Sequence, residues 1–325
     1  MSLRLCLLVS VLSVAALAAV EDPLPSWNDG ATKQAIVSFV NAAVSDGGPE
    51  FVPVAERIAV FDNDGTLWSE QPLYFQLQFA LDQIVAQAPA HPEWETTEPF
   101  ASVLAGDIEK ALAEGDAAIL ALVMATHGGM SADDFQASVR SWLETARHPK
   151  LKRRYDRLIY QPMVELLVYL RANEFKTYIV SGGGIDFIRV FAQEAYGIPP
   201  EQVIGSRAKA SYELRDGVPT IVKHGELEFL DDKADKPVAI HQIIGRRPVF
   251  AAGNSDGDFA MLEWTTAGAG PRFGLLVHHT DVEREWAYDR ESHIGKLVRG
   301  LDEAAQRGWA LADMAADWRQ VFPAE

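Results

Sequence analysis

A short apolar run that ends abruptly in a polar loop places the strongest constraint on how this chain folds. Residues 56–61 (ERIAVF) are rich in β-prone side chains, and the loop Asp62-Asn-Asp-Gly-Thr66 follows without a spacer. A run of this length bounded by a turn signal predicts a buried strand that stops at the loop. Helix-like segments separate it from further apolar runs of the same kind, at 176–180, 248–252 and 274–277. Strands that alternate with helices predict an α/β fold, a Rossmann-like doubly wound parallel sheet.

The segment after the first strand has a different pattern. Residues 70 to about 150 are rich in Ala and Leu and are interrupted by Pro and Gly, which predicts a series of helices. Ser131, with Asp134 three residues later, is expected to cap the last of them. The predicted domains are a helical cap at 76–154 and a Rossmann-like core built from 19–75 and 155–325.

Two segments within the predicted core have patterns of their own. Residues 203–222 alternate between apolar and polar side chains around Asp216-Gly217, which predicts a β-hairpin. The stretch 294–318 is expected to be helical and to serve packing.

The first 18 residues have the layout of a secretory signal peptide. Arg4 precedes an apolar run, and Ala16-Leu-Ala18 offers a cleavage site after Ala18. The run is shorter than the about 20 residues of a spanning helix. We therefore expect a periplasmic or secreted protein with no stable membrane anchor after cleavage; an uncleaved anchor or a buried helix is the alternative. Cys6 is the only cysteine, so the mature protein would have no disulfide, catalytic thiol or zinc–cysteine site.

The charge balance limits the partners. Asp and Glu number 46 against 29 Lys and Arg, a formal net charge of −17. A surface of this sign repels the phosphate backbone of nucleic acids and anionic membranes. A small anionic ligand would need positive charge assembled locally.

Polar loops follow three of the predicted strands. They are Asp62 to Thr66, Ser181 to Gly184 and Gly253 to Asp258, with Lys233 to Lys236 between the last two. Ligands in open α/β sheets bind beyond the carboxyl ends of the strands, where these loops would meet. Carboxylates brought together need a cation, and a set of oxygen ligands favours Mg²⁺. An ammonium group and glycine-rich amides favour a phosphate.

Each loop also has an ordinary interpretation. Asp62 could begin a calcium loop, but an EF-hand would need Gly and Glu where Leu67 and Leu73 stand. The glycines after Ser181 are typical of a tight turn, a single lysine is usually a surface charge, and Asp256 or Asp258 could cap a helix. It is their joint appearance, each at a strand end or helix start, that predicts a site.

At these residues the sequence resembles the haloacid dehalogenase superfamily, in particular its phosphatases with a helical cap, such as phosphoserine phosphatases. Phe61 to Leu67 is similar to the first motif, Ser181 to the second, Lys236 to the third, and Gly253 to Asp258 to the fourth. The resemblance spans about 56–280. It implies a hydrolase of phosphate monoesters with an aspartyl-phosphate intermediate.

The resemblance also implies a role for each matching residue. Asp62 would be the nucleophile, and Asp64 would protonate the leaving group and then activate water. Ser181 would hold phosphate oxygens and Lys236 would stabilise the developing charge. Mg²⁺ would be bound by Asp62, Asp64, Asn254 and Asp258. The implied substrate-binding residues are Thr66, Glu70, Arg140, Gly182 and Gly183.

The sequence departs from the family pattern in two places. Asn254 stands where the fourth motif normally has Asp, so Asp256 or Asp258 could take over part of the metal binding. Lys233 is an alternative to Lys236 as the lysine of the third motif. Asp64 separates phosphatases from the dehalogenase branch, which lacks an acid/base at that position.

The implied substrate is a small phosphorylated metabolite. Glu70 or Gln71 lies near the position at which phosphoserine phosphatases read the substrate amine. Trp142 stands where that family has a carboxylate-reading arginine, with Arg140 as a possible substitute. Trp68, Trp142 and Tyr74 would line a pocket or, as aromatic residues at helical spacing more often do, belong to the core. The alternative function is a non-catalytic protein that binds a divalent cation or a phosphoester on the same fold.

Overall fold

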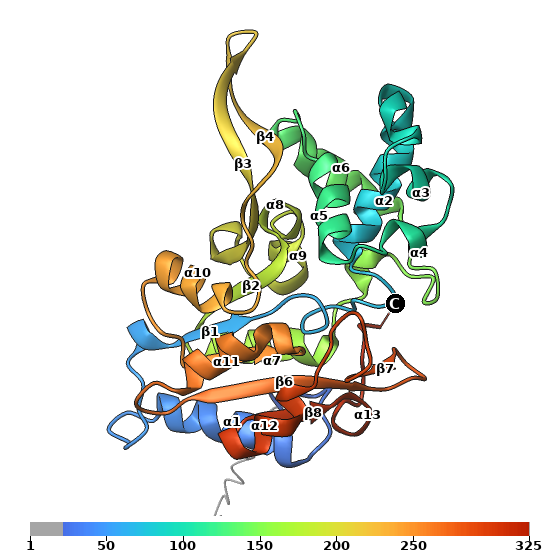
Figure 1. Ribbon diagram of the computed structural model, residues 1–325. Coiled ribbons are helices and arrows are strands. Elements are labelled where there is room, and N and C mark those ends of the chain that lie inside the picture. Colours follow the sequence, from blue (N-terminus) through green and yellow to red (C-terminus); the bar gives the residue numbers. More distant parts are fainter. Residues whose placement is uncertain (1–21, 325) are drawn as a thin grey trace, which may run out of the picture.

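A computed structural model describes residues 22–324 of the chain (Figure 1). Its described residues contain an eight-stranded sheet with the order β4-β3-β2-β1-β5-β6-β7, and β8 pairs with β6. The strands are β1 (Ile58–Phe61), β2 (Lys176–Gly184), β3 (Val203–Arg215), β4 (Val218–Phe229), β5 (Phe250–Gly253), β6 (Phe273–Thr280), β7 (Ala287–Tyr288) and β8 (Ala310–Asp313). The sheet core is flanked by α1 (Ala31–Val44), α7 (Gln161–Ala172), α8 (Ile185–Ile188), α9 (Ala192–Tyr196), α10 (Asp235–Ile244), α11 (Phe259–Thr266), α12 (Arg299–Arg307) and α13 (Met314–Asp317).

The centre of the sheet is parallel, as the sequence predicts. β1 lies between β2 and β5, with Phe61 opposite Ile179 on one side and Ala252 on the other. All four residues of β1 are buried, since helices cover both faces of the sheet. The α/β prediction is therefore confirmed, and the carboxyl ends of β1, β2 and β5 meet at one edge.

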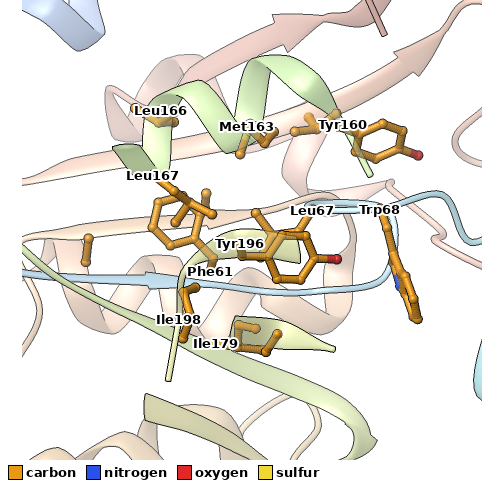
Figure 2. Close-up of a cluster of buried hydrophobic side chains, with 14 of the residues drawn as sticks. Phe61, Leu67, Trp68, Tyr160, Met163, Leu166, Leu167, Ile179, Tyr196 and Ile198 are labelled. Carbon is orange, nitrogen blue, oxygen red and sulfur yellow. The ribbon is translucent and has the colours of Figure 1, made fainter. Parts of the chain in front are cut away.

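Alternate residues of each central strand point into two different cores. Phe61, Ile179 and Ala252 belong to the larger core, which includes α1 and α7. Figure 2 shows Phe61 with residues of α7 above it. Val60 and Val180 face the opposite core, which includes residues of α10 and α11. Because apolar side chains pack on both faces of β1, the first polar side chain of this segment comes directly after the strand, at Asp62.

A series of helices lies between β1 and α7. They are α2 (Phe75–Gln87), α3 (Phe100–Leu104), α4 (Ile108–Ala111), α5 (Asp116–Ala125) and α6 (Ala132–Thr145). The predicted cap of α6 is confirmed, because the Ser131 hydroxyl accepts a hydrogen bond from the Asp134 amide at 3.0 Å. α2, α3 and α5 share a core of their own that includes Leu77, Ile84 and Leu122. The domain boundaries at 76–154 remain a prediction.

The predicted hairpin is also present and is longer than expected. β3 and β4 pair across Asp216-Gly217 and rise beyond the sheet beside α5 and α6 (Figure 1). β4 pairs with the turn before α6 through Lys223. The Lys223 amide donates to the Met130 carbonyl at 2.9 Å, and the Lys223 carbonyl accepts a hydrogen bond from the Gly129 amide at 3.0 Å. The hairpin thus ties the helical segment to the sheet.

Two expectations differ from the structure. The glycines after Ser181 extend β2 to Gly184 through an irregularity, and α8 begins only after them. The stretch 294–318 is not helical throughout, because Ala310–Asp313 forms β8, parallel to β6. The open edge of β6 supplies the hydrogen bonds that make this segment a strand, and that edge is remote in sequence.

The remaining expectations concern the N-terminal end. The predicted signal peptide (1–18) and Cys6 lie outside the described residues. Among residues 22–324, no helix is both long enough and apolar enough to cross a bilayer.

Candidate active site

The loop after β1 is shaped by its own main chain. The Asp62 amide still donates to Ala252 in the sheet at 2.9 Å, and the Asn63 carbonyl then accepts from the Leu67 amide at 2.8 Å. Gly65 has φ of +71° and donates its amide to the Trp68 carbonyl at 2.9 Å. A Cβ at Gly65 would lie 2.0 Å from Asn254 Nδ2. Glycine is required here both by the left-handed backbone and by the close approach of Asn254.

Lys236 lies between two carboxylates. Its Nζ donates to Asp62 Oδ1 and Asp258 Oδ1, both at 2.6 Å, and to the Val180 carbonyl at 3.1 Å. All three charged side chains are buried. Lys233 is exposed beside Asp232, so Lys236 is the lysine that reaches the strand ends.

Asp258 connects this ion pair to the loop after β5. Its second oxygen, Oδ2, accepts the amides of Asn254 and Ser255 at 3.0 and 3.1 Å. Asp256 instead accepts the amides of Val298 and Gly300 at the start of α12. Asp258 therefore holds the loop and Lys236, whereas Asp256 caps a helix.

Asp64 faces the end of β2. Its Oδ1 accepts a hydrogen bond from Trp68 Nε1 at 2.8 Å, and the Ser181 hydroxyl lies 3.5 Å from Oδ2. The Ser181 hydroxyl also accepts the Gly183 amide at 3.0 Å. Burial raises the pKa of Asp64, and the hydrogen bond from Trp68 offsets part of the increase. A carboxyl group in this setting is suited to hold and release a proton.

Asn254 and Glu70 complete the polar cluster at the strand ends, which also contains Asp62, Asp64, Lys236 and Asp258. Asn254 Nδ2 donates to Glu70 Oε1 at 2.6 Å, and Thr66 Oγ1 donates to Asn254 Oδ1 at 3.3 Å. Tyr288 also donates to Glu70 Oε1, at 2.8 Å. Burial raises the pKa of Glu70 well above its ordinary value.

The cluster holds more negative than positive charge. Burial and repulsion from Asp258 raise the pKa of Asp62 well above its usual range, and attraction to Lys236 offsets only part of this. Hard oxygen donors with excess negative charge fit a divalent cation. Among residues 22–324, no three His, Cys, Asp or Glu side chains form a ready-made metal cluster. A cation here would therefore need amide or carbonyl oxygens in addition to carboxylates.

Three further residues that the sequence suggested for substrate binding differ in their surroundings. Gly182 is exposed near the end of β2, and its carbonyl accepts a hydrogen bond from the Ser206 hydroxyl at 2.7 Å. Arg140 is exposed on α6 and makes no described contact with the cluster. Trp142 is buried and donates to Asp82 at 2.7 Å, which makes it a core residue, as is Trp68.

Sequence reasoning missed several side chains that contact the cluster. The sequence predicts Trp68 as a pocket-lining or core residue but not as a hydrogen-bond donor, although its indole nitrogen donates to Asp64. Gln76 accepts the Gly184 amide at 2.6 Å, and Tyr288 reaches Glu70 from a distance of 218 residues. The sequence carries no motif for these contacts, because helix and sheet packing alone bring them together.

Asp231 is a buried carboxyl beside this site. It is fully buried, and neither side-chain oxygen has a hydrogen-bond partner among the described residues. Its amide donates to Ser206, the same residue that binds the Gly182 carbonyl. Burial raises the pKa of Asp231 to about 7, although attraction to Lys236 and Arg207 opposes the increase.

The chain is similar to known proteins in sequence and in fold. The family model for haloacid dehalogenase-like hydrolases matches residues 59–263. A structure of a protein with unknown function from Bordetella pertussis Tohama I is 17% identical, with a TM-score of 0.50, covering 80% of this chain and 99% of that one. A functionally unknown protein from Anaerococcus prevotii DSM 20548 is 17% identical, with a TM-score of 0.54 and coverage of 89% and 93%. No curated protein matches the sequence. At this identity the two structures show a shared fold.

The contact between Gly65 and Asn254 generates the first prediction. We expect Gly65→Ala to lower the free energy of unfolding by about 2–4 kcal/mol, because it combines left-handed strain with overpacking. The control is Gly106→Ala, where φ is +77° and no atom lies within 4 Å of the new Cβ. It should lose only the strain, about 1–2 kcal/mol. If urea unfolding shows the same loss of free energy of unfolding in both variants, the side chains around Gly65 accommodate the new methyl group without cost, which contradicts the prediction.

The second prediction concerns Asp231 and pH. Because its folded pKa lies near 7 and the ordinary value is 3.8, the folded state retains a proton that the unfolded state loses. Its contribution to stability therefore falls by roughly 4 kcal/mol as pH rises from 4 to 7. Asp231→Asn should be more stable relative to wild type at pH 8 than at pH 5, measured by urea unfolding. The exposed Asp46→Asn should show no such trend; a parallel trend in both variants contradicts the prediction.

Proposed function

The chain belongs to the haloacid dehalogenase-like hydrolase family, and we propose that it is a magnesium-dependent phosphatase of small phosphorylated metabolites. The observation that carries the proposal is the Lys236 ammonium bound to Asp62 Oδ1 at the end of β1. It holds one oxygen of the carboxylate, while no hydrogen bond among the described residues occupies the other. Asp64 and Ser181 lie at the same sheet edge.

Asp62 is the proposed nucleophile. Its free oxygen attacks phosphorus, the bond from phosphorus to the leaving alkoxide breaks, and an aspartyl-phosphate forms. Lys236 prevents rotation of the carboxylate and offsets charge that develops on the phosphoryl oxygens. In the second half of the reaction, water attacks the phosphorus of the aspartyl-phosphate, the bond from phosphorus to Asp62 breaks, and phosphate leaves.

Asp64 is the proposed acid and base. In the first half its carboxyl proton passes to the leaving oxygen, and in the second half the same carboxylate takes a proton from water. Its raised pKa favours the protonated form that the first half requires. Trp68 holds one carboxyl oxygen, which leaves the other to face the reaction.

The phosphate would be held by the carboxyl-terminal end of β2, from Ser181 onward. The Ser181 hydroxyl and the Gly182 amide are the proposed donors at the same sheet edge as Lys236, while the Gly183 amide holds the Ser181 oxygen at 3.0 Å. Gln76 and Ser206 bind the main chain at this end of β2, at 2.6 and 2.7 Å, which supports a fixed arrangement of the donors.

Asp62, Asn254 and the main-chain carbonyl of Asp64 are the proposed ligands of Mg²⁺. When bound, the ion would neutralise the repulsion between carboxylate and phosphate and polarise the phosphoryl group. The Gly65 amide, which belongs to the same peptide as that carbonyl, donates to Trp68, so the peptide cannot turn. Asp258 is not a proposed metal ligand, because both of its carboxylate oxygens already accept hydrogen bonds; it instead holds Lys236 and the Asn254 main chain in place.

The substrate is proposed at the level of a class. Glu70 is a buried acidic group beside the cluster and could read a substrate amine, as phosphoserine would offer. Arg140 is exposed and Trp142 is packed, so neither supports a carboxylate reader in the helical segment. Export to the periplasm or the medium remains part of the proposal, on the layout of residues 1–18.

Asp62→Asn tests the nucleophile. We expect turnover of p-nitrophenyl phosphate with Mg²⁺ to fall by a factor on the order of 10³ or more, because the amide cannot attack phosphorus. Asp46→Asn, an exposed substitution of the same kind, should retain full turnover. Unchanged turnover in a folded Asp62→Asn protein would remove the mechanism. Stabilisation of wild type by phosphate without any turnover would favour the non-catalytic binding protein.

Removal of the metal tests the second part of the proposal. Dialysis against EDTA should reduce turnover of p-nitrophenyl phosphate to background, and added Mg²⁺ should restore it, because the buried carboxylates then regain a counter-charge. Full turnover in metal-free buffer, checked by elemental analysis, would show that Lys236 alone supplies the positive charge.

A further inference from the structure

A buried histidine contacts the catalytic loop from behind. His279, at the end of β6, is only 2% exposed. Its Nε2 lies 2.8 Å from the Gly65 carbonyl, and its Nδ1 lies 3.3 Å from Glu285 Oε2. Each ring nitrogen of His279 therefore lies within hydrogen-bond distance of an oxygen that accepts hydrogen bonds, one on a main-chain carbonyl and one on a carboxylate.

Glu285 is the anchor of this histidine. It is fully buried, and its carboxylate accepts hydrogen bonds from Ser69 Oγ at 2.5 Å, the Trp286 amide at 2.8 Å and Tyr160 OH at 3.1 Å. The hydrogen bonds and attraction to His279 lower the pKa of Glu285 despite its burial. Glu285 therefore keeps its charge inside the core.

Gly65 is the residue of the loop that most needs such support. Glycine has the greatest backbone freedom, and Gly65 separates Asp64 from Thr66. Its amide is held by the Trp68 carbonyl and its own carbonyl by His279, so the peptides on both sides are fixed. A displacement of about 1 Å in a reacting group can lower a rate by about 10²-fold.

His279 also contacts a second part of the site. Its ring stacks on Tyr288, with centroids 4.3 Å apart and an interplanar angle of 19°. Tyr288 in turn donates to Glu70 Oε1. One ring thus supports both the catalytic loop and the partner of Glu70.

We propose that His279 is a positioning residue, which, held by its contact with Glu285, clamps the Gly65 peptide and thereby orients Asp64. The inference rests on the proposed phosphatase function and adds a pair that belongs to none of the four motifs. It assigns the pair no contact with substrate.

The test uses three variants of the full-length protein. His279→Phe keeps a ring against Tyr288 but removes both ring nitrogens, whereas His279→Gln can restore a donor toward Gly65. His278→Phe is the matched control, because His278 points to the opposite face of β6 and contacts Asp289 at 3.2 Å. Each is assayed for kcat and KM on p-nitrophenyl phosphate and for amide hydrogen exchange of residues 62–68.

We expect His279→Phe to lower kcat by about 10²-fold with KM changed less than about threefold, and to speed exchange in 62–68. His279→Gln should recover at least about tenfold of the lost kcat, and His278→Phe should match wild type. A folded His279→Phe protein with normal kcat, or a His279→Gln protein no better than it, would overturn the positioning role. Unchanged exchange would refute the clamp alone, whereas a wild type without turnover would refute the phosphatase and the positioning role together.

Discussion

The ion pair of Lys236 with Asp62 and Asp258 is the interaction on which the site depends. Burying three charged groups is costly unless they satisfy one another, and here one ammonium binds an oxygen of each carboxylate at 2.6 Å. Because each group comes from a different segment, the pair fastens the ends of β1 and β5 to the start of α10. Charge attraction thus fixes the geometry that hydrophobic packing leaves open.

The buried carboxylates around this pair fall into two kinds. Glu285 is fully hydrogen-bonded and stays charged, which is typical of a structural group. Asp62, Glu70 and Asp231 are buried with too few donors, and burial raises the pKa of each. Such under-compensated groups lower stability and are typical of functional sites. Their concentration at one sheet edge is consistent with a role for a cation and a phosphate there.

The sequence predicted much of the frame and some of the details. Apolar runs bounded by polar loops identified β1, β2, β5 and β6, and Asp216-Gly217 identified the hairpin. Ser131 was predicted as a cap because its partner is only three residues away. β8 was missed, since its strand conformation comes from pairing with β6 and not from its own pattern. Local signals were sufficient where the interacting groups are close in sequence.

By itself, the sequence determined which polar groups lie at strand ends, because strand periodicity and the parallel sheet bring those ends to one edge. Only the tertiary structure decided which oxygen meets which donor. Lys236 rather than Lys233 reaches Asp62, Asp256 caps α12 while Asp258 holds the lysine, and His279 supports Gly65 across 214 residues. These choices depend on distances of a few ångströms set by packing between remote segments, and no spacing within one segment encodes them.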